Sequence, residues 1–101
     1  MTMSVLTSKQ RQYLRGLAHP LAPVVRVGKA GVTESVITET RKSLHSHELI
    51  KVRIEVDESA ERKTLAQKLA EASDAQIAGT VGKVAILYRA REEEPEIQLP
   101  G

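Results

Sequence analysis

The stretch Val27-Gly28-Lys29-Ala30-Gly31-Val32-Thr33 decides how this chain folds. A valine-rich run over residues 24–27 leads into it and predicts a short strand. Behind it, Thr33 is a residue type that caps helix starts, and side chains suited to a core then recur at helical spacing. These positions are Val36, Ile37, Thr40 and Leu44. The stretch therefore predicts a glycine-containing loop between a strand and an amphipathic helix.

The two glycines of this loop, Gly28 and Gly31, favour contact with an anion. Glycine adopts backbone angles that other residues avoid, so a phosphate-bearing chain can approach without meeting a side chain at either corner. The N–H groups at the start of the helix favour negative charge, and Lys29 adds a full positive charge. The simpler interpretation is a tight turn with an exposed lysine, because glycine pairs at this spacing occur by chance in many loops.

Two further helices are expected. Thr7 or Ser8 caps the first, which runs to about Ala18, and two prolines that follow prevent its continuation. Its expected inner side holds Gln10, Leu14, Leu17 and Leu21. The helix behind Thr33 runs to about His45. A third helix starts at Asp57 or Ser59 and ends before Ser73, with an apolar stripe of Leu65, Ala66, Leu69, Ala70 and Ala72.

Three more strands complete the expected set, after the one at Pro23–Val27. The clearest spans Leu49–Val56, where apolar side chains alternate with Lys51, Arg53 and Glu55, so that one side is buried and the other is wet. Gln76–Thr80 and Val84–Arg89 form a hairpin. The order α-β-α-β-α-β-β predicts a single compact α/β domain with a small mixed four-stranded sheet.

Composition limits the functions that this domain can have. Its 101 residues suit one domain with one core. Only Tyr13 and Tyr88 are aromatic, so a platform that stacks bases on exposed rings is not expected. The absence of cysteine removes disulfides, thiol catalysis and thiolate metal sites. Apolar runs are far shorter than a bilayer span, and no signal pattern opens the chain, so we expect a cytoplasmic protein without membrane contact.

Charge is distributed unevenly along the chain. Residues 1–45 carry seven basic and two acidic side chains, a net charge of +5, whereas the remainder carries eight basic and eleven acidic, a net charge of −3. The positive half contains the glycine loop, which indicates a polyanionic partner. The alternative is that lysine and arginine only solvate helix surfaces.

Histidines and carboxylates suggest no catalytic or metal site. His45 and His47 lack a third ligand at suitable spacing and suit a helix C-terminus, where the dipole favours cations. His19, before Pro20, is expected to fix a turn. The chain contains no nucleophile elbow, P-loop or dinucleotide fingerprint. We therefore expect no enzymatic activity, no cofactor and no metal.

Four segments give the chain a family resemblance. These are Leu6–Leu21 (LTSKQRQYLRGLAHPL), Val24–Glu34 (VVRVGKAGVTE), His47–Val52 (HELIKV) and Gly82–Arg89 (GKVAILYR). Together they resemble the bacterial stand-alone CRM-domain proteins, the YhbY-like family, over about residues 4–100. The resemblance implies a fold similar to the C-terminal domain of translation initiation factor three, and an RNA-binding domain over residues 1–92. Residues 93–101 are expected to form an acidic, partly ordered tail.

The resemblance also implies a function and a set of contact residues. The family's bacterial members associate with precursors of the large (50S) ribosomal subunit, which implies a role in ribosome assembly and rRNA as the partner of a monomeric protein. The implied RNA-contacting loop is Gly28, Lys29, Ala30 and Gly31. The implied basic surface around it is formed by Lys9, Arg11, Arg15, Arg26, Arg41, Lys42 and Lys51.

Two hypotheses for the binding chemistry remain open. In the first, the loop and the start of the following helix seat phosphates, and basic side chains extend the track. In the second, the domain docks on a ribosomal protein or assembly factor, and its basic half only steers it towards RNA. The wet side of Leu49–Val56 and the acidic tail motivate the second hypothesis.

Overall fold

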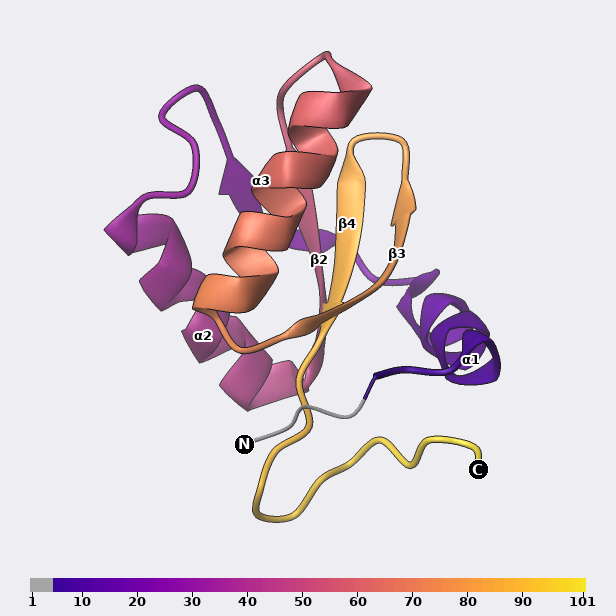
Figure 1. The fold of residues 1–101 in the computed structure, drawn as a ribbon. Coiled ribbons are helices and arrows are strands. Elements are labelled where there is room, and N and C mark those ends of the chain that lie inside the picture. The colour runs from indigo at the N-terminus through magenta and orange to yellow at the C-terminus, as the bar shows by residue number, and fades with distance from the viewer. Residues whose placement is uncertain (1–4) are drawn as a thin grey trace.

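Four strands form one mixed sheet in the order β1-β2-β4-β3 (Figure 1). The structure is a computed structural model and describes residues 5–101. The strands are β1 (Pro23–Val27), β2 (Leu49–Ile54), β3 (Gln76–Val81) and β4 (Val84–Tyr88). β1 and β2 are parallel, whereas β4 is antiparallel to both of its neighbours. The predicted mixed four-stranded sheet is confirmed.

Three helices cover the two sides of this sheet. They are α1 (Ser8–Ala18), α2 (Glu34–His47) and α3 (Ser59–Ala72). α2 and α3 pack on one side, called here the α2/α3 face, and α1 packs on the other, the α1 face (Figure 1). The chain is thus a single α/β domain, as predicted. No helix within residues 5–101 is long and apolar enough to cross a bilayer.

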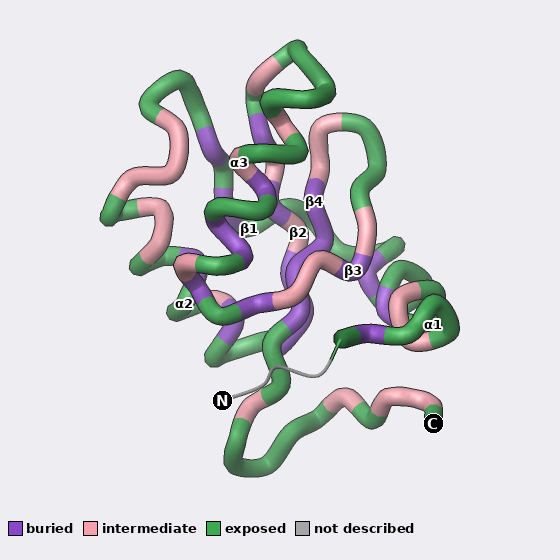
Figure 2. The backbone as a smooth tube through the Cα atoms, viewed as in Figure 1, coloured by how far each residue is buried: buried purple, intermediate pink, exposed green. Residues whose placement is uncertain are grey.

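Alternation in β2 determines what each side of the sheet buries. Ile50, Val52 and Ile54 point into the core beneath α2 and α3. Leu49 points the other way, into a smaller cluster beneath α1. Figure 2 shows the buried segments gathered on the central strands and on the helix sides that face them. Lys51 and Arg53 follow Leu49 on the α1 face and are only partly buried.

Two predicted features of the elements are wrong in detail. Leu17 and Leu21 are 39% and 41% exposed, because α1 packs on the sheet through Leu14 and Ala18, one turn apart. β2 ends at Ile54 rather than Val56, because its partner β1 turns into the glycine loop after Val27, whose carbonyl still accepts a hydrogen bond from the N–H of Glu55 (2.8 Å).

The C-terminal segment is tied to the domain by one buried carboxylate. Glu48 is 1% exposed and follows α2 with a positive φ of 62°. Its carboxylate accepts hydrogen bonds from the backbone N–H groups of Arg91 (2.9 Å), Glu96 (2.7 Å) and Ile97 (3.0 Å). Ile97 and Leu99 then pack against the cluster beneath α1. The segment after β4 is irregular but is held at both ends of its path.

The hydrogen bonds to Glu48 make the stability of the fold depend on pH. Burial alone raises the pKa of the Glu48 carboxyl, but the three N–H donors and the charge of Arg91 outweigh it and lower the pKa below the ordinary value of 4.5. A lowered pKa in the folded state means that the ionised carboxylate stabilises the fold above about pH 4.5. This contribution is lost as the pH falls through the folded-state pKa.

We therefore predict that Glu48→Gln lowers the free energy of unfolding at pH 7 by about 1–3 kcal/mol, since buried N–H groups lose a charged acceptor. The deficit relative to the wild type begins to shrink at about pH 4.5, where the carboxyl of the unfolded chain becomes protonated, and it disappears as the pH falls through the lower pKa of the folded wild type. Urea denaturation at pH 7 and pH 3.5 measures both effects. Glu93→Gln, at an exposed acid of the same segment, is the matched control. Equal stability of the two variants at pH 7 would contradict the role of Glu48.

Candidate nucleic-acid interface

The predicted glycine loop joins β1 to α2 at one end of the sheet. β2 also ends there, and the β3–β4 hairpin turns there (Figure 1). The carbonyl of Gly28 accepts a hydrogen bond from the N–H of Gly31 (3.0 Å), which closes a turn with Lys29 and Ala30 at its tip. The prediction of a tight, exposed loop between a strand and a helix is confirmed.

The two glycines of the loop serve different purposes. Gly31 has φ 76°, a conformation that residues with a Cβ adopt only at a cost. Gly28 has no positive φ, and a Cβ built on it would meet nothing within 4 Å. Folding therefore requires a glycine at position 31 but not at position 28. The glycine at position 28 leaves a stretch of exposed backbone open to a ligand.

The start of α2 adds donors next to this open backbone. The Thr33 side chain accepts a hydrogen bond from the N–H of Val36 (3.2 Å), as its predicted capping role requires. The N–H groups of Glu34 and Ser35 take no partner among the residues that the structure describes. Glu34 brings a negative charge into this first turn. The positive charge of the loop therefore depends on Lys29, whose side chain makes no polar contact within residues 5–101.

Three of the predicted basic residues lie at separate points of the α1 face of the sheet. The Arg15 guanidinium donates to the carbonyl of Ala78 (3.4 Å) and lies over Gly79, and the Lys51 ammonium donates to the carbonyl of His19 (3.2 Å). The Arg26 guanidinium pairs with Glu55. Each side chain keeps exposed atoms, so this face carries positive charge towards solvent.

The remaining predicted basic residues are spread more widely. Lys9 and Arg11 lie at the start of α1, where the Arg11 guanidinium donates to the carbonyl of Leu6 (2.8 Å). Arg41 and Lys42 are on α2, on the opposite side of the sheet, and Arg41 donates twice to the carbonyl of Ala72 at the end of α3 (2.7 and 3.1 Å). The structure therefore does not bring all of the predicted residues to one surface.

One basic residue that the sequence prediction omitted lies beside Arg26. Arg53 is the Cα partner of Arg26 in the parallel β1–β2 pair, and its Nε lies 3.3 Å from the same Glu55 carboxylate oxygen that Arg26 contacts. The alternation of side chains in the sequence of β2 does predict that Arg53 lies on the solvent-exposed side. Only the pairing of β1 with β2 distinguishes it from an ordinary surface arginine.

The histidines and acidic side chains of residues 5–101 form no second candidate site. His45 and His47 are exposed in the last turn of α2. Within the described part of the chain, no three histidine and acidic side chains are arranged to hold a metal ion. The loop and the α1 face of the sheet remain the candidate interface.

The fold and the loop define a class: small α/β domains in which a glycine-pinched basic turn precedes a helix on a four-stranded mixed sheet. Comparison with protein-family models shows which family of this class the chain belongs to. Residues 6–89 match the model of the CRS1 / YhbY (CRM) domain. This chain belongs to the CRS1/YhbY (CRM) domain family, and the resemblance seen in the sequence is confirmed.

Similar proteins come from several microorganisms. A Haemophilus influenzae protein named "RNA-binding protein" is 40% identical over 98 residues, covering 97% of this chain and 98% of its own length. The "Probable RNA-binding protein YqeI" of Bacillus subtilis is 35% identical and covers 95% of this chain and 100% of its own length. The solution structure of the Staphylococcus aureus protein SAV1595 superposes with a TM-score of 0.85 at 38% identity, covering 95% of this chain and 100% of that chain.

The different environments of the two loop glycines predict different stabilities. Gly31→Ala forces a side chain into a left-handed conformation and costs roughly 1–2 kcal/mol in the free energy of unfolding. Gly28→Ala enters open space and changes it by less than about 0.5 kcal/mol. Urea denaturation of both variants beside the wild type tests this. Equal destabilisation by the two substitutions would contradict the described loop geometry.

Proposed function

We propose that this protein binds RNA, with the phosphate backbone seated on the Gly28–Gly31 turn. The observation that carries the proposal is Gly28: its glycine is not needed for the backbone conformation, yet it leaves the main chain bare beside Lys29 and the start of α2. Exposed N–H groups at a helix start, together with a lysine, match the chemistry of a phosphate. Membership of the CRM family and relatives named as RNA-binding proteins support the same assignment.

In this proposal a basic track continues from the turn over the α1 face of the sheet. Arg26, Lys51 and Arg15 extend the track, and Lys9 with Arg11 at the start of α1 lengthen it. Arg41 and Lys42 lie on the other side and would contact a separate part of a folded RNA. If about six phosphates are contacted, affinity falls by roughly a thousandfold from low to moderate salt.

The positions of the two tyrosines favour recognition of RNA through its backbone and shape rather than through base stacking. Tyr88 is buried beneath α1, and Tyr13 is a lone ring on α1. Base stacking on a row of rings is thus not open to this surface.

We further propose rRNA in the precursor of the large ribosomal subunit as the partner, bound in the cytoplasm by a monomer. The binding unit would be residues 1–92, with residues 93–101 as a tail that is anchored to the domain through Glu48 and through the packing of Ile97 and Leu99. This finer assignment depends on the family resemblance and on the positive charge of the first half of the chain. The role is binding rather than catalysis.

Docking on a protein of the assembling particle is a second candidate. Leu17, Leu21 and Val24 are each about two-fifths exposed, between 39% and 45%, around the α1–β1 connection. Exposed apolar side chains at neighbouring positions suit a protein surface better than a phosphate. Cross-linking within the particle separates the candidates, because docking predicts protein adducts and no RNA adduct at the turn.

The proposal predicts that Lys29→Ala and Gly28→Ala each weaken binding to a large-subunit rRNA fragment, by about three- to tenfold, without unfolding the domain. Lys29→Ala also reduces the slope of log affinity against log salt by about 1, because one phosphate contact is lost. Fluorescence anisotropy across a salt series measures both. Lys68→Ala, at an exposed lysine on α3, is the charge-matched control.

Three results would contradict this assignment. The first is a wild-type affinity that does not depend on salt. The second is a Gly28→Ala variant that binds as the wild type does. The third is a Lys68→Ala variant as weak as Lys29→Ala, which would reduce the role of Lys29 to its contribution to net charge.

A further inference from the structure

One row of side chains on the α1 face has no covering element. It runs across all four strands through directly paired positions: Val81 on β3, Val84 on β4, Arg53 on β2 and Arg26 on β1. Directly paired residues project on the same side of a sheet, so these four side chains form one line. We call this line the open row. With strands about 4.8 Å apart, it spans about 14 Å.

The open row is exposed because α1 covers a different part of the same face. α1 buries Leu14 and Ala18 against Leu49, Ile86 and Tyr88, which lie further from the hairpin end of the sheet. In the open row, the Val81 residue is 64% exposed, and the side chains of Arg26 and Arg53 are 73% and 42% exposed. Val84 is partly buried, so the row combines an apolar half, exposed chiefly at Val81, and a cationic half on one side of the sheet.

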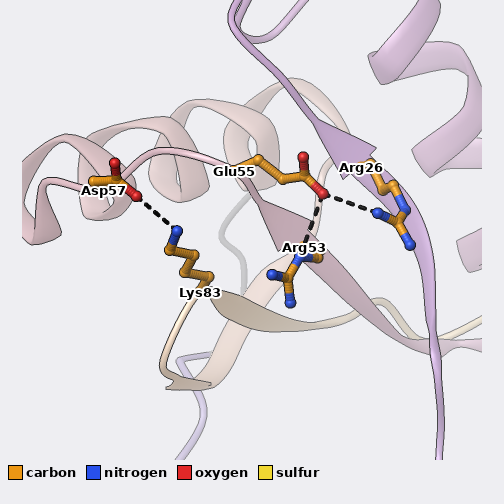
Figure 3. Close-up of polar contacts among 5 residues, drawn as sticks. All are labelled: Arg26, Arg53, Glu55, Asp57 and Lys83. Carbon is orange, nitrogen blue, oxygen red and sulfur yellow. Dashed lines mark hydrogen bonds and ion pairs between the residues drawn. The ribbon is translucent and has the colours of Figure 1, made fainter.

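Glu55 holds the cationic half in place (Figure 3). Its Oε1 lies 2.9 Å from Nη1 of Arg26 and 3.3 Å from Nε of Arg53, so one carboxylate oxygen draws the two guanidinium groups together. Exposed ion pairs of this kind contribute little to folding. The arrangement therefore has little value for stability, while it places two phosphate-binding groups side by side and masks part of their charge.

We propose that the open row binds single-stranded RNA, with Arg26 and Arg53 exchanging Glu55 for phosphate oxygens and with ribose or base packing on Val81 and Val84. A guanidinium matches a phosphate as well as it matches a carboxylate, and the exposed pair with Glu55 is easily exchanged. Unpaired bases can reach exposed apolar side chains such as Val81, whereas the bases of a duplex are turned inwards. This inference rests on the proposed function.

Position along the strand connects the open row to the glycine loop. Arg26 precedes Gly28 by two residues, so their Cα atoms are about 7 Å apart along β1. A single strand that leaves a phosphate on the turn can therefore pass directly onto the row. Glu55 then has a specific role: it competes with the RNA for the two arginines and lowers the affinity of the row.

The test is a gain of affinity, which misfolding cannot imitate. The probe is a 12-nucleotide single-stranded RNA of mixed sequence, compared with the same sequence annealed to its complement. Glu55→Gln removes the negative charge that competes for both guanidinium groups and is expected to tighten single-strand binding about three- to tenfold, with a steeper salt dependence. Arg53→Gln is expected to weaken it by a similar factor. Glu71→Gln, an exposed acid on α3, makes the same change in net charge away from the row.

A double variant tests whether the gain passes through the arginine. In the Arg53→Gln background, Glu55→Gln is expected to tighten binding by less than half of its effect in the wild type, because one of the two freed groups is absent. Urea denaturation confirms that each variant folds. A gain no larger than that of Glu71→Gln, or an equal gain for the duplex, would overturn the proposal.

The same series distinguishes failure of this inference from failure of the proposed function. If Lys29→Ala weakens binding to both probes while the Arg53 and Glu55 variants match the wild type, the turn binds phosphate and the open row does not bind RNA. If the wild type binds neither probe above the level of an unrelated protein, both proposals fall. Tighter single-strand binding by Glu55→Gln alone supports the row.

Discussion

The alternation of side chains along β2 is the constraint on which the rest of this structure depends. β2 is a central strand, between β1 and β4. Because successive side chains of a strand point to opposite faces, its sequence determines what both faces of the sheet must bury. Ile50, Val52 and Ile54 require cover, which α2 and α3 provide. On the other side only Leu49 is apolar, and burying the charge of Arg53 without a partner would be costly. α1 is therefore confined to one part of that face, and the remaining part stays open.

Local signals predict the elements and the sheet, because strand alternation, helix spacing and capping by Thr33 are properties of neighbouring residues. The order of elements then leaves few topologies. The packed side of α1 is predicted only in part: Leu14 is buried as expected, whereas Leu17 and Leu21 stay exposed and Ala18 packs in their place. The Glu48 carboxylate is equally invisible in the sequence, because its partners lie 43–49 residues further on.

The candidate interface shows the same division between local and long-range information. The seven consecutive residues Val27–Thr33 predict a glycine-containing loop between a strand and a helix, and the structure adds the hydrogen bond that closes it into a turn. The grouping of Arg26 with Arg53 and Glu55 arises from pairing between strands, which no local pattern contains. The sequence also does not show that the two glycines differ in their roles. The backbone angles show that Gly31 is needed for the conformation of the turn, whereas Gly28 leaves the main chain exposed.

The most direct test of the central claim, that RNA lies where the turn meets the open row, is an amide chemical-shift titration of the isotope-labelled protein with a short single-stranded RNA. RNA bound there is expected to cause the largest shifts in residues 28–35 and at Arg26, Arg53 and Val84, with the outer side of α3 around Lys68 unchanged. Shifts confined to α2 and α3, with the turn and the open row unaffected, would contradict it.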